Sequence, residues 1–328
     1  NHVRMIYSRK TIKYYQVLVF SLIACNSALI GALEEPVDKL LGDMEFANPL
    51  TIEKSEDTYR QLVPSGRSKI AHLCQDLSDK LNGMQIEACT NNGLYPSRLT
   101  SALGRPLLYA EVKPIFETLG NRRILLVGGQ HGDELSSVKL VFNWLSQLNK
   151  SPSPNTLWRV LPAANPDGIL STRATRTNAN GIDLNRNLPT PNWLTQADKY
   201  WEGKGSNERY FPGVKPASEP ETQWLMQQIE EFAPDAIISV HAPLGIFDFN
   251  SNDLSIAPRT LGPLNLYLLG TFPGSLGNYA GMSRNVPVIT IELKHSYEIP
   301  DTPETQHMWA DLHNWLDNFS TNEALVNN

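Results

Sequence analysis

Apolar and polar positions follow two patterns from about residue 97 onward. Short apolar runs bounded by turn residues predict strands, and longer stretches with apolar residues at helical spacing predict helices. Strands that alternate with helices indicate an α/β fold, here a single three-layer α/β/α domain with a mixed, mostly parallel, twisted sheet. The predicted strands are 105–112, 122–128, 157–162, 235–241 and 286–292, and the predicted helices are 134–148, 220–232 and 304–319.

Two kinds of segment lie outside this alternation. Apolar residues at helical spacing within 55–92 predict a small helical segment in front of the α/β domain. Long loops rich in Pro, Gly and Asn are expected at 163–219 and 242–285, and loops of such length are usually functional. The resulting division is a leader at 1–25, a linker at 26–50, a helical N-terminal segment at 51–96, the α/β domain at 97–320 and a tail at 321–328.

The leader has the pattern of an export signal. Basic residues precede the apolar run 17–24, which is typical of a secretory signal, and Cys25 follows this run. The segment 22–25 resembles the bacterial lipobox, in which the cysteine is lipidated. We therefore expect export to the periplasm, with attachment to a membrane through a lipidated Cys25 or with plain cleavage. The alternatives are an uncleaved N-terminal anchor, although about 20 apolar residues are needed to span a bilayer, and a cytoplasmic protein.

The net charge and the cysteine content of the chain bear on its binding partners and on its redox environment. The chain has 328 residues and a formal net charge of −6, which gives no electrostatic footprint for nucleic acid. Besides Cys25, the only cysteines are Cys74 and Cys89. In an oxidising compartment these two residues could form a disulfide, and two buried free thiols are the alternative.

Titratable residues gather at the ends of predicted strands. His131 and Glu134 follow the strand 122–128 directly, and a histidine with a carboxylate is a donor pair that zinc accepts. His241 ends the strand 235–241, and Glu292 lies at the end of the strand 286–292. The carboxyl edge of an open α/β sheet is the usual place for a site, so these residues are expected to meet there.

Together with a polar loop, these residues resemble the M14 zinc carboxypeptidases, in particular the murein peptide amidase branch. The resemblance extends over roughly 97–320 and leaves out the helical N-terminal segment. The residues that carry it are His131-Gly-Asp-Glu134, Asn165-Pro-Asp-Gly168, Arg176, Gly181-Ile-Asp-Leu-Asn185-Arg186-Asn187, Ser218-Glu-Pro-Glu-Thr222, His241 and Thr290-Ile-Glu292.

The resemblance implies a role for each of these positions that their chemistry also allows. His131, Glu134 and His241 would hold one Zn²⁺ per chain and leave a position for water, as in a catalytic site. Glu292 would be the general base. Arg176 would stabilise an oxyanion, and Asn185 with Arg186 would bind a substrate carboxylate.

Three further assignments are less direct. Arg173 lies close to Arg176 and could take the oxyanion role instead, although the Arg-x-Asn context favours Arg176. Pancreatic members of the family close a mobile tyrosine over the substrate, and Tyr279 is the best substitute here, with Tyr267 behind it. Asp133 has no assigned role, and orienting His131 is a role that it could take.

The expected function is a zinc metallopeptidase or amidase that hydrolyses a peptide bond next to a free carboxylate. The resemblance implies murein peptides as substrate and the γ-D-glutamyl–diaminopimelate bond as the scissile bond. One alternative is an N-acyl amino acid deacylase of the succinylglutamate desuccinylase or aspartoacylase type. A catalytically inactive wall-binding protein is another, although no ligand and no base is missing from the sequence.

Overall fold

The computed structural model of the protein describes residues 68–117 and 121–326, with side chains placed up to residue 319. The leader with Cys25, the linker and the first part of the helical N-terminal segment lie outside the described residues. All described residues belong to one compact unit.

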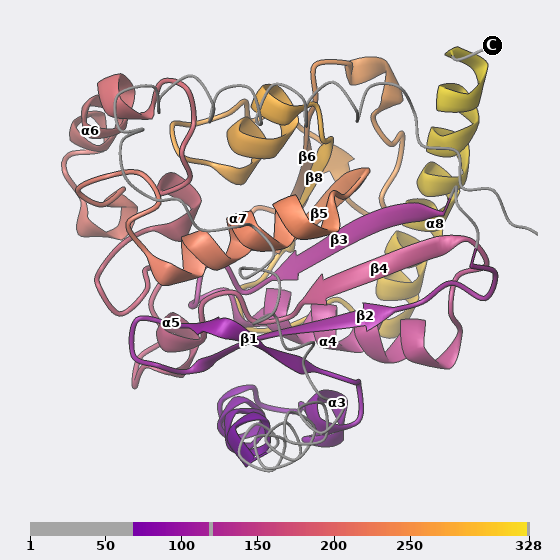
Figure 1. Ribbon diagram of the computed structural model, residues 1–328, viewed down its shortest axis with the longest axis horizontal. Helices are drawn as coiled ribbons and strands as arrows, with labels where there is room; N and C mark the ends of the chain where they lie inside the picture. Colours follow the sequence, from indigo (N-terminus) through magenta and orange to yellow (C-terminus); the bar gives the residue numbers. More distant parts are fainter. Residues whose placement is uncertain (1–67, 118–120, 327–328) are drawn as a thin grey trace, which may run out of the picture. The chain divides into compact units, whose positions relative to one another are not determined.

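An eight-stranded mixed sheet forms the centre of this unit, in the order β1-β2-β4-β3-β5-β8-β6-β7 (Figure 1). The neighbours β4, β3, β5 and β8 run parallel. At one side of the sheet, β1 pairs antiparallel with β2 and β2 pairs antiparallel with β4, and at the other side β6 pairs antiparallel with β8 and parallel with β7. The predicted α/β fold with a mixed sheet is therefore confirmed. The strands are β1 (Tyr95–Thr100), β2 (Pro106–Val112), β3 (Arg122–Gly128), β4 (Thr156–Leu161), β5 (Ala236–His241), β6 (Ile246–Asn250), β7 (Asn265–Leu266) and β8 (Val288–Glu292).

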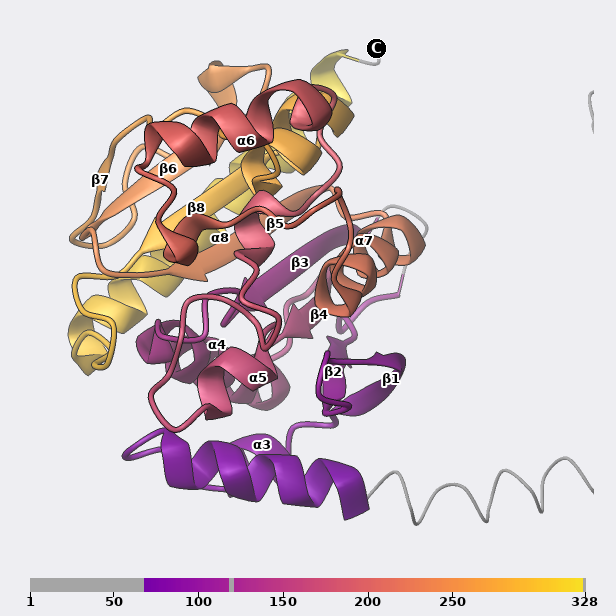
Figure 2. The same cartoon turned by 90° about the vertical axis from the view of Figure 1, so that its left-hand side faces the viewer.

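Helices cover both faces of the sheet and complete three layers (Figures 1 and 2). On one face, α4 (Leu135–Lys150) and α8 (Thr302–Val326) pack into a core that contains Trp144 and Trp309. On the other face, α7 (Pro220–Phe232) and the π-helical turn η5 (Gly277–Met282) pack into a second core that contains Trp224.

The central strands were predictable because they are buried on both faces. All six residues of β5 are buried, and such strands read as continuous apolar runs. Because β3, β5 and β8 are parallel, their carboxyl ends meet at one edge of the sheet. This edge brings together Gly128, His241 and Glu292, and the register pairs the last two directly.

The predicted long loops contain elements that the sequence pattern did not reveal. The segment 163–219 contains α5 (Pro166–Leu170) and α6 (Trp193–Gly203), and 242–285 contains β6, β7 and η5. The prediction of loops over these two ranges was therefore wrong where these elements lie. Helix α6 buries few side chains, and β6 has polar residues on one face, so neither shows a strong apolar pattern.

The helical N-terminal segment packs on the same core as α4. A helix covers 68–80, and α3 (Glu87–Thr90) follows it. The side chains of Leu73, Leu77 and Leu81 are buried in this core. Cys74 and Cys89 form a disulfide, as one of the two predicted alternatives had it. Within the described part of the chain, no helix is both long and apolar enough to cross a membrane.

Candidate active site

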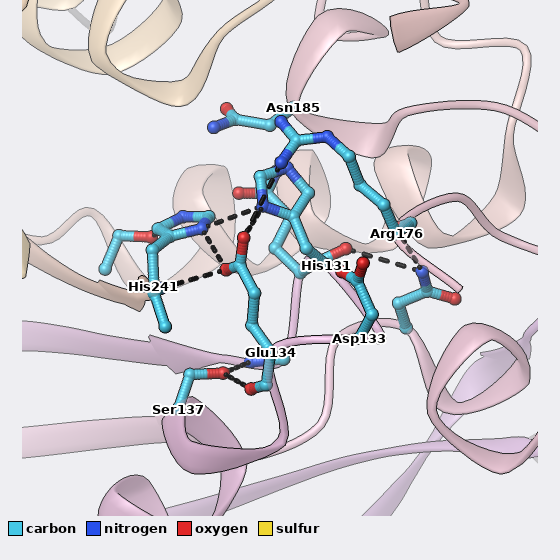
Figure 3. A network of polar contacts seen from close by, with 12 residues as sticks. His131, Asp133, Glu134, Ser137, Arg176, Asn185 and His241 are labelled. Atoms are coloured by element: carbon cyan, nitrogen blue, oxygen red, sulfur yellow. Dashed lines mark hydrogen bonds and ion pairs between the residues drawn. The ribbon is translucent and has the colours of Figure 1, made fainter. Parts of the chain in front are cut away.

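Three side chains from separate segments converge at the carboxyl edge of the sheet. The Nδ1 atom of His131 lies 2.8 Å from Oε1 of Glu134, and Nδ1 of His241 lies 2.9 Å from Oε2 of the same carboxylate. The two Nδ1 atoms are 3.0 Å apart. All three residues are buried and point toward one another (Figure 3).

The remaining ring nitrogens are fixed by neighbours behind the site. Nε2 of His131 lies 3.2 Å from Oδ1 of Asp183, and Nε2 of His241 lies 3.0 Å from Oγ of Ser239. Asp183 can only accept, so it favours the proton on Nε2 and leaves Nδ1 of His131 as a lone pair. This is the arrangement that orients a histidine toward a metal ion.

Asp183 also fixes Arg176. Nε of Arg176 donates to Oδ2 of Asp183 at 2.9 Å, and Nη1 of Arg176 lies 3.5 Å from Oε1 of Glu134. Burial opposes ionisation of Asp183, but Arg176 and His131 outweigh it and hold the pKa of this carboxyl well below its usual range. The sequence assigned no role to Asp183, although it stands inside the motif that contains Asn185.

Close backbone packing sets the position of His131. Gly132 lies against Gly168 so closely that a Cβ at residue 132 would be 2.3 Å from the Gly168 carbonyl carbon. Asn165 holds the two segments together, since its Nδ2 donates to the carbonyl oxygens of Gln130 and Arg176 at 3.4 and 3.3 Å. Only glycine at residue 132 permits this approach.

The side chain of Glu292 is largely buried next to this cluster, one strand away from His241. Its Oε2 atom is buried and accepts no hydrogen bond among the described residues. Burial raises the pKa of Glu292 above its ordinary value, with the neighbouring Glu134 acting in the same direction and His241 opposing it. A carboxylate in this situation is suited to accept and return a proton.

A second group of donors lies across the cavity. Arg186 is buried, and its guanidinium stacks on the rings of Phe272 and Tyr200 at 4.7 and 5.3 Å. Its Nη1 donates to the carbonyl oxygen of Asn185, whereas its Nε has no hydrogen-bond partner among the described residues. A buried cation with an unused donor is a suitable partner for a carboxylate.

These residues line one cavity of about 370 Å³. It contains His131, Glu134, His241, Glu292, Arg176, Asn185 and Arg186, so the structure brings all but one of the predicted site residues together. Arg173 is not among its lining residues, whereas Arg176 is.

Tyr279 is the predicted site residue that the structure places elsewhere. Its ring is fully buried in the core on the α7 side, under the guanidinium of Arg284, and it does not line the cavity. Tyr267 is exposed and does not line it either. Tyr200 and Tyr210, from the loop 163–219, line the cavity instead, and no pattern in the sequence distinguishes them from other tyrosines.

Asp133 does not orient His131. Its carboxylate pairs with Arg209. The carboxylate that lies next to Nε2 of His131 and orients this ring belongs to Asp183. Other residues of the motifs act as scaffold. Asn178 donates to Glu219 and Glu221 at 2.7 and 3.0 Å, which ties the polar loop to the start of α7.

The donor set fits a zinc ion. The candidate ligand atoms of His131, Glu134 and His241 all lie within 4.8 Å of one another. Two imidazole nitrogens and a carboxylate, with room for water in the adjoining cavity, are the donors of an open catalytic zinc site.

Comparisons with known proteins agree with this geometry. Residues 97–244 match the zinc carboxypeptidase family, peptidase M14. The chain is 35% identical over 198 residues to murein peptide amidase A of Escherichia coli K12, covering 58% of this chain and 78% of that protein. It is 34% identical over 203 residues to the protein of the same name from Vibrio campbellii, covering 59% of this chain and 76% of the relative.

The fold is also found among solved structures. Carboxypeptidase A from Helicoverpa armigera aligns with a TM-score of 0.55 at 17% identity, covering 74% of this chain and 70% of the other. At this identity the likeness concerns the fold alone.

Proposed function

The chain belongs to the zinc carboxypeptidase family, peptidase M14, and on this basis we propose that it is a zinc-dependent amidase that cleaves murein peptides next to a free carboxylate. As a member of this family it is a hydrolase. The observation that carries the proposal is the convergence of His131, Glu134 and His241 beside Glu292, a half-buried carboxylate whose buried Oε2 atom has no hydrogen-bond partner in the part of the chain that the structure describes.

Each step of the proposed hydrolysis has a candidate residue. A bound zinc ion supplies Lewis acidity and lowers the pKa of water to about 7. Glu292 accepts the proton of the attacking water and returns it to the leaving amine. Arg176, fixed by Asp183, donates to the oxygen that becomes negative when the scissile carbonyl turns tetrahedral.

The carboxylate of the substrate is the proposed partner of Arg186 and Asn185. Nε of Arg186 has no hydrogen-bond partner within 68–117 and 121–326, and the guanidinium stacks on Phe272. Both observations support this assignment, because the guanidinium is already held in place before substrate arrives. A substrate bound in this way presents the amide next to its terminal carboxylate to the site. The γ-D-glutamyl–diaminopimelate bond of murein peptides is the proposed scissile bond.

Mass spectrometry of products from defined muropeptides tests the function. The zinc-loaded protein should convert L-alanyl-γ-D-glutamyl-diaminopimelate into alanyl-glutamate and free diaminopimelate. Glu292→Gln should lower kcat by about 10² to 10⁴-fold while zinc content remains that of the wild type, because it removes proton transfer and leaves the ligands intact. Much faster hydrolysis of acetyl-aspartate or succinyl-glutamate than of any peptide would instead identify a deacylase.

We also propose that the protein is exported and that its mature form begins at or near Cys25. The basic and apolar pattern of the leader and the disulfide between Cys74 and Cys89 support an oxidising compartment. Intact-mass measurement on protein from fractionated cells tests this. A lipidated N-terminus in the membrane fraction that Cys25→Ser removes is the expected result, and full-length protein in the cytoplasm would contradict it.

A further inference from the structure

Two cations that line the active-site cavity have no role in the proposed hydrolysis. Lys204 and Arg209 line it together with the two arginines of the proposed mechanism. The Nζ atom of Lys204 lies 5.5 Å from the ring centroid of Tyr200, on which Arg186 also stacks. Lys204 therefore belongs to the end of the cavity where the terminal carboxylate of the substrate is expected, whereas Arg209 lies beside a different residue, Asp133.

Arg209 is held next to the metal ligands by Asp133. Nη1 of Arg209 forms an ion pair with Oδ2 of Asp133. Asp133 directly precedes the ligand Glu134. In Figure 3, Asp133 and Asn185 lie on opposite sides of His131. Since Asn185 belongs to the group proposed for the terminal carboxylate, Arg209 lies on the side of the ligands where the acyl part of the substrate is expected.

The short helix that carries Arg209 is fixed by its neighbours. This 3₁₀ helix is η3 (Glu208–Tyr210), and Oδ1 of Asn207 caps it by accepting from the backbone N–H of Arg209 at 2.9 Å. The ring of the next residue, Tyr210, has its centroid 5.3 Å from the guanidinium carbon of Arg176. The proposed oxyanion donor and Arg209 are therefore held at neighbouring positions of the cavity wall.

The guanidinium of Arg209 has donors left for a ligand. A guanidinium carries about five N–H donors. Asp133 uses Nη1, and the side chain of Arg209 has no other partner within 68–117 and 121–326. The side chain of Arg209 is 44% exposed and that of Asp133 only 16%, so the carboxylate holds the guanidinium from its inner side. The outer side is left for the bidentate contact with a second carboxylate to which arginine is suited.

We propose that Arg209 binds a second carboxylate of the substrate, on the acyl side of the scissile bond, and thereby selects acyl groups that carry one. The inference deepens the proposed function and rests on it, since the scissile carbonyl must lie at the metal ligands with the terminal carboxylate on Arg186. In a γ-linked glutamyl group, four bonds separate the α-carboxylate from the scissile carbonyl carbon, a reach of about 5 Å. Asp133 and Glu134 have Cα atoms about 3.8 Å apart, so the partner of Asp133 lies at a comparable distance from the metal ligands.

Two peptides that differ only in this carboxylate provide the test. L-alanyl-γ-D-glutamyl-diaminopimelate and L-alanyl-4-aminobutyryl-diaminopimelate present the same amide bond, and the zinc-loaded full chain should prefer the first at least about tenfold in kcat/KM. Arg209→Gln should reduce this ratio to near one, because glutamine lacks the charge. Arg259→Gln is the matched control, since it removes an exposed arginine that does not line the cavity, and the wild-type ratio should persist.

Arg209→Lys separates recognition of the carboxylate from a merely structural contact with Asp133. Lysine keeps the charge but loses the bidentate geometry, so its ratio should lie between those of the wild type and Arg209→Gln. If Arg209 only ties η3 to Asp133, both variants would change kcat/KM for the two peptides by the same factor. The ratio would then stay at its wild-type value, which would overturn the inference.

Calorimetric titration of the zinc-loaded Glu292→Gln protein with both intact peptides separates the inference from the proposed function, because it measures binding without turnover. The γ-glutamyl peptide should bind at least about tenfold more tightly, and the double variant Glu292→Gln/Arg209→Gln should bind both equally. Cleavage of both peptides by the wild type at the same kcat/KM overturns the role of Arg209 and leaves the amidase function standing. Preferential binding without cleavage of any peptide overturns the function and leaves the carboxylate site at Arg209 standing.

Discussion

The Nδ1 atoms of His131 and His241 lie 3.0 Å apart, although 110 positions separate the two residues in the chain. With the proton of His131 on Nε2 beside Asp183, its Nδ1 directs a lone pair at the same point as the carboxylate of Glu134. Converging lone pairs repel one another unless a cation lies between them. The native state is therefore expected to bind zinc far better than the unfolded chain does.

Zinc should accordingly stabilise the fold. A ligand that binds only the native state adds about 2.7 kcal/mol at a concentration 100 times its Kd, so zinc added to chelated protein should raise Tm by several degrees. Elemental analysis should find one zinc per chain in the wild type and less than about a tenth of that in His241→Ala. An unchanged Tm after chelation, with full zinc removal, would contradict the assignment.

Asp183→Asn should weaken zinc binding and activity about 10- to 100-fold, the effect typical of residues that orient metal ligands. The substitution preserves the shape of the side chain but replaces one carboxylate oxygen with an NH₂ group. This NH₂ group would face either Nε2 of His131 or Nε of Arg176, and both of these nitrogens donate a hydrogen bond and need an acceptor. Zinc affinity and kcat/KM measure the loss.

Asp133→Asn is the matched control, since Asp133 pairs with Arg209 and does not contact His131 in the structure. Its zinc affinity should remain within about threefold of wild type. An effect as large as that of Asp183→Asn would mean that the orienting role is shared.

The contrast between Asp183 and Asp133 illustrates what the sequence can predict. Ligands at the ends of strongly apolar, buried strands are predictable, because parallel strands bring their carboxyl ends to one edge. The role of Asp183 is not, because it depends on how a loop of 163–219 folds onto a residue 52 positions away. Local spacing favoured Asp133, which is nearer in the chain but faces Arg209.

The same reasoning explains the placement of Tyr279 and the missed strand β6. Tyr279 lies between glycines, a pattern that is typical of a mobile loop. In the structure it belongs to η5, and its ring is buried in the core. The polar Asp248 and Asn250 in β6 make the strand look like a loop, because its polar face lines the cavity. The pattern of apolar and polar residues therefore does not predict a strand such as β6, whose polar side chains face a cavity.

The disulfide between Cys74 and Cys89 should contribute stability away from the site. It closes a loop with a sequence separation of 15, for which restriction of the unfolded chain is worth about 3 kcal/mol. The double variant Cys74→Ser/Cys89→Ser should therefore show a lower free energy of unfolding in urea, with kcat/KM close to wild type. Equal midpoints for wild type and variant would remove this role.

His313 should make stability depend on pH. Its Nε2 is buried without a hydrogen-bond partner among the described residues, and its ring packs on Trp309 and Trp158 with centroids 4.5 and 5.8 Å away. Burial lowers the pKa of His313 below the ordinary 6.5, Asp317 opposes this shift, and Arg122 acts in the same direction as burial. Below about pH 6.5 the unfolded chain therefore binds this proton more readily than the folded chain, so acidification should lower the free energy of unfolding.

Urea unfolding of wild type and His313→Gln at pH 7.5, 6.5 and 5.5 measures this contribution. The difference in unfolding free energy between the two proteins should shift in favour of the variant as the pH falls, because glutamine takes up no proton. His72→Gln, which removes an exposed histidine from the helix over 68–80, is the matched control and should leave the pH dependence parallel to wild type. Parallel curves for His313→Gln as well would show that burial of this imidazole is not what couples stability to pH.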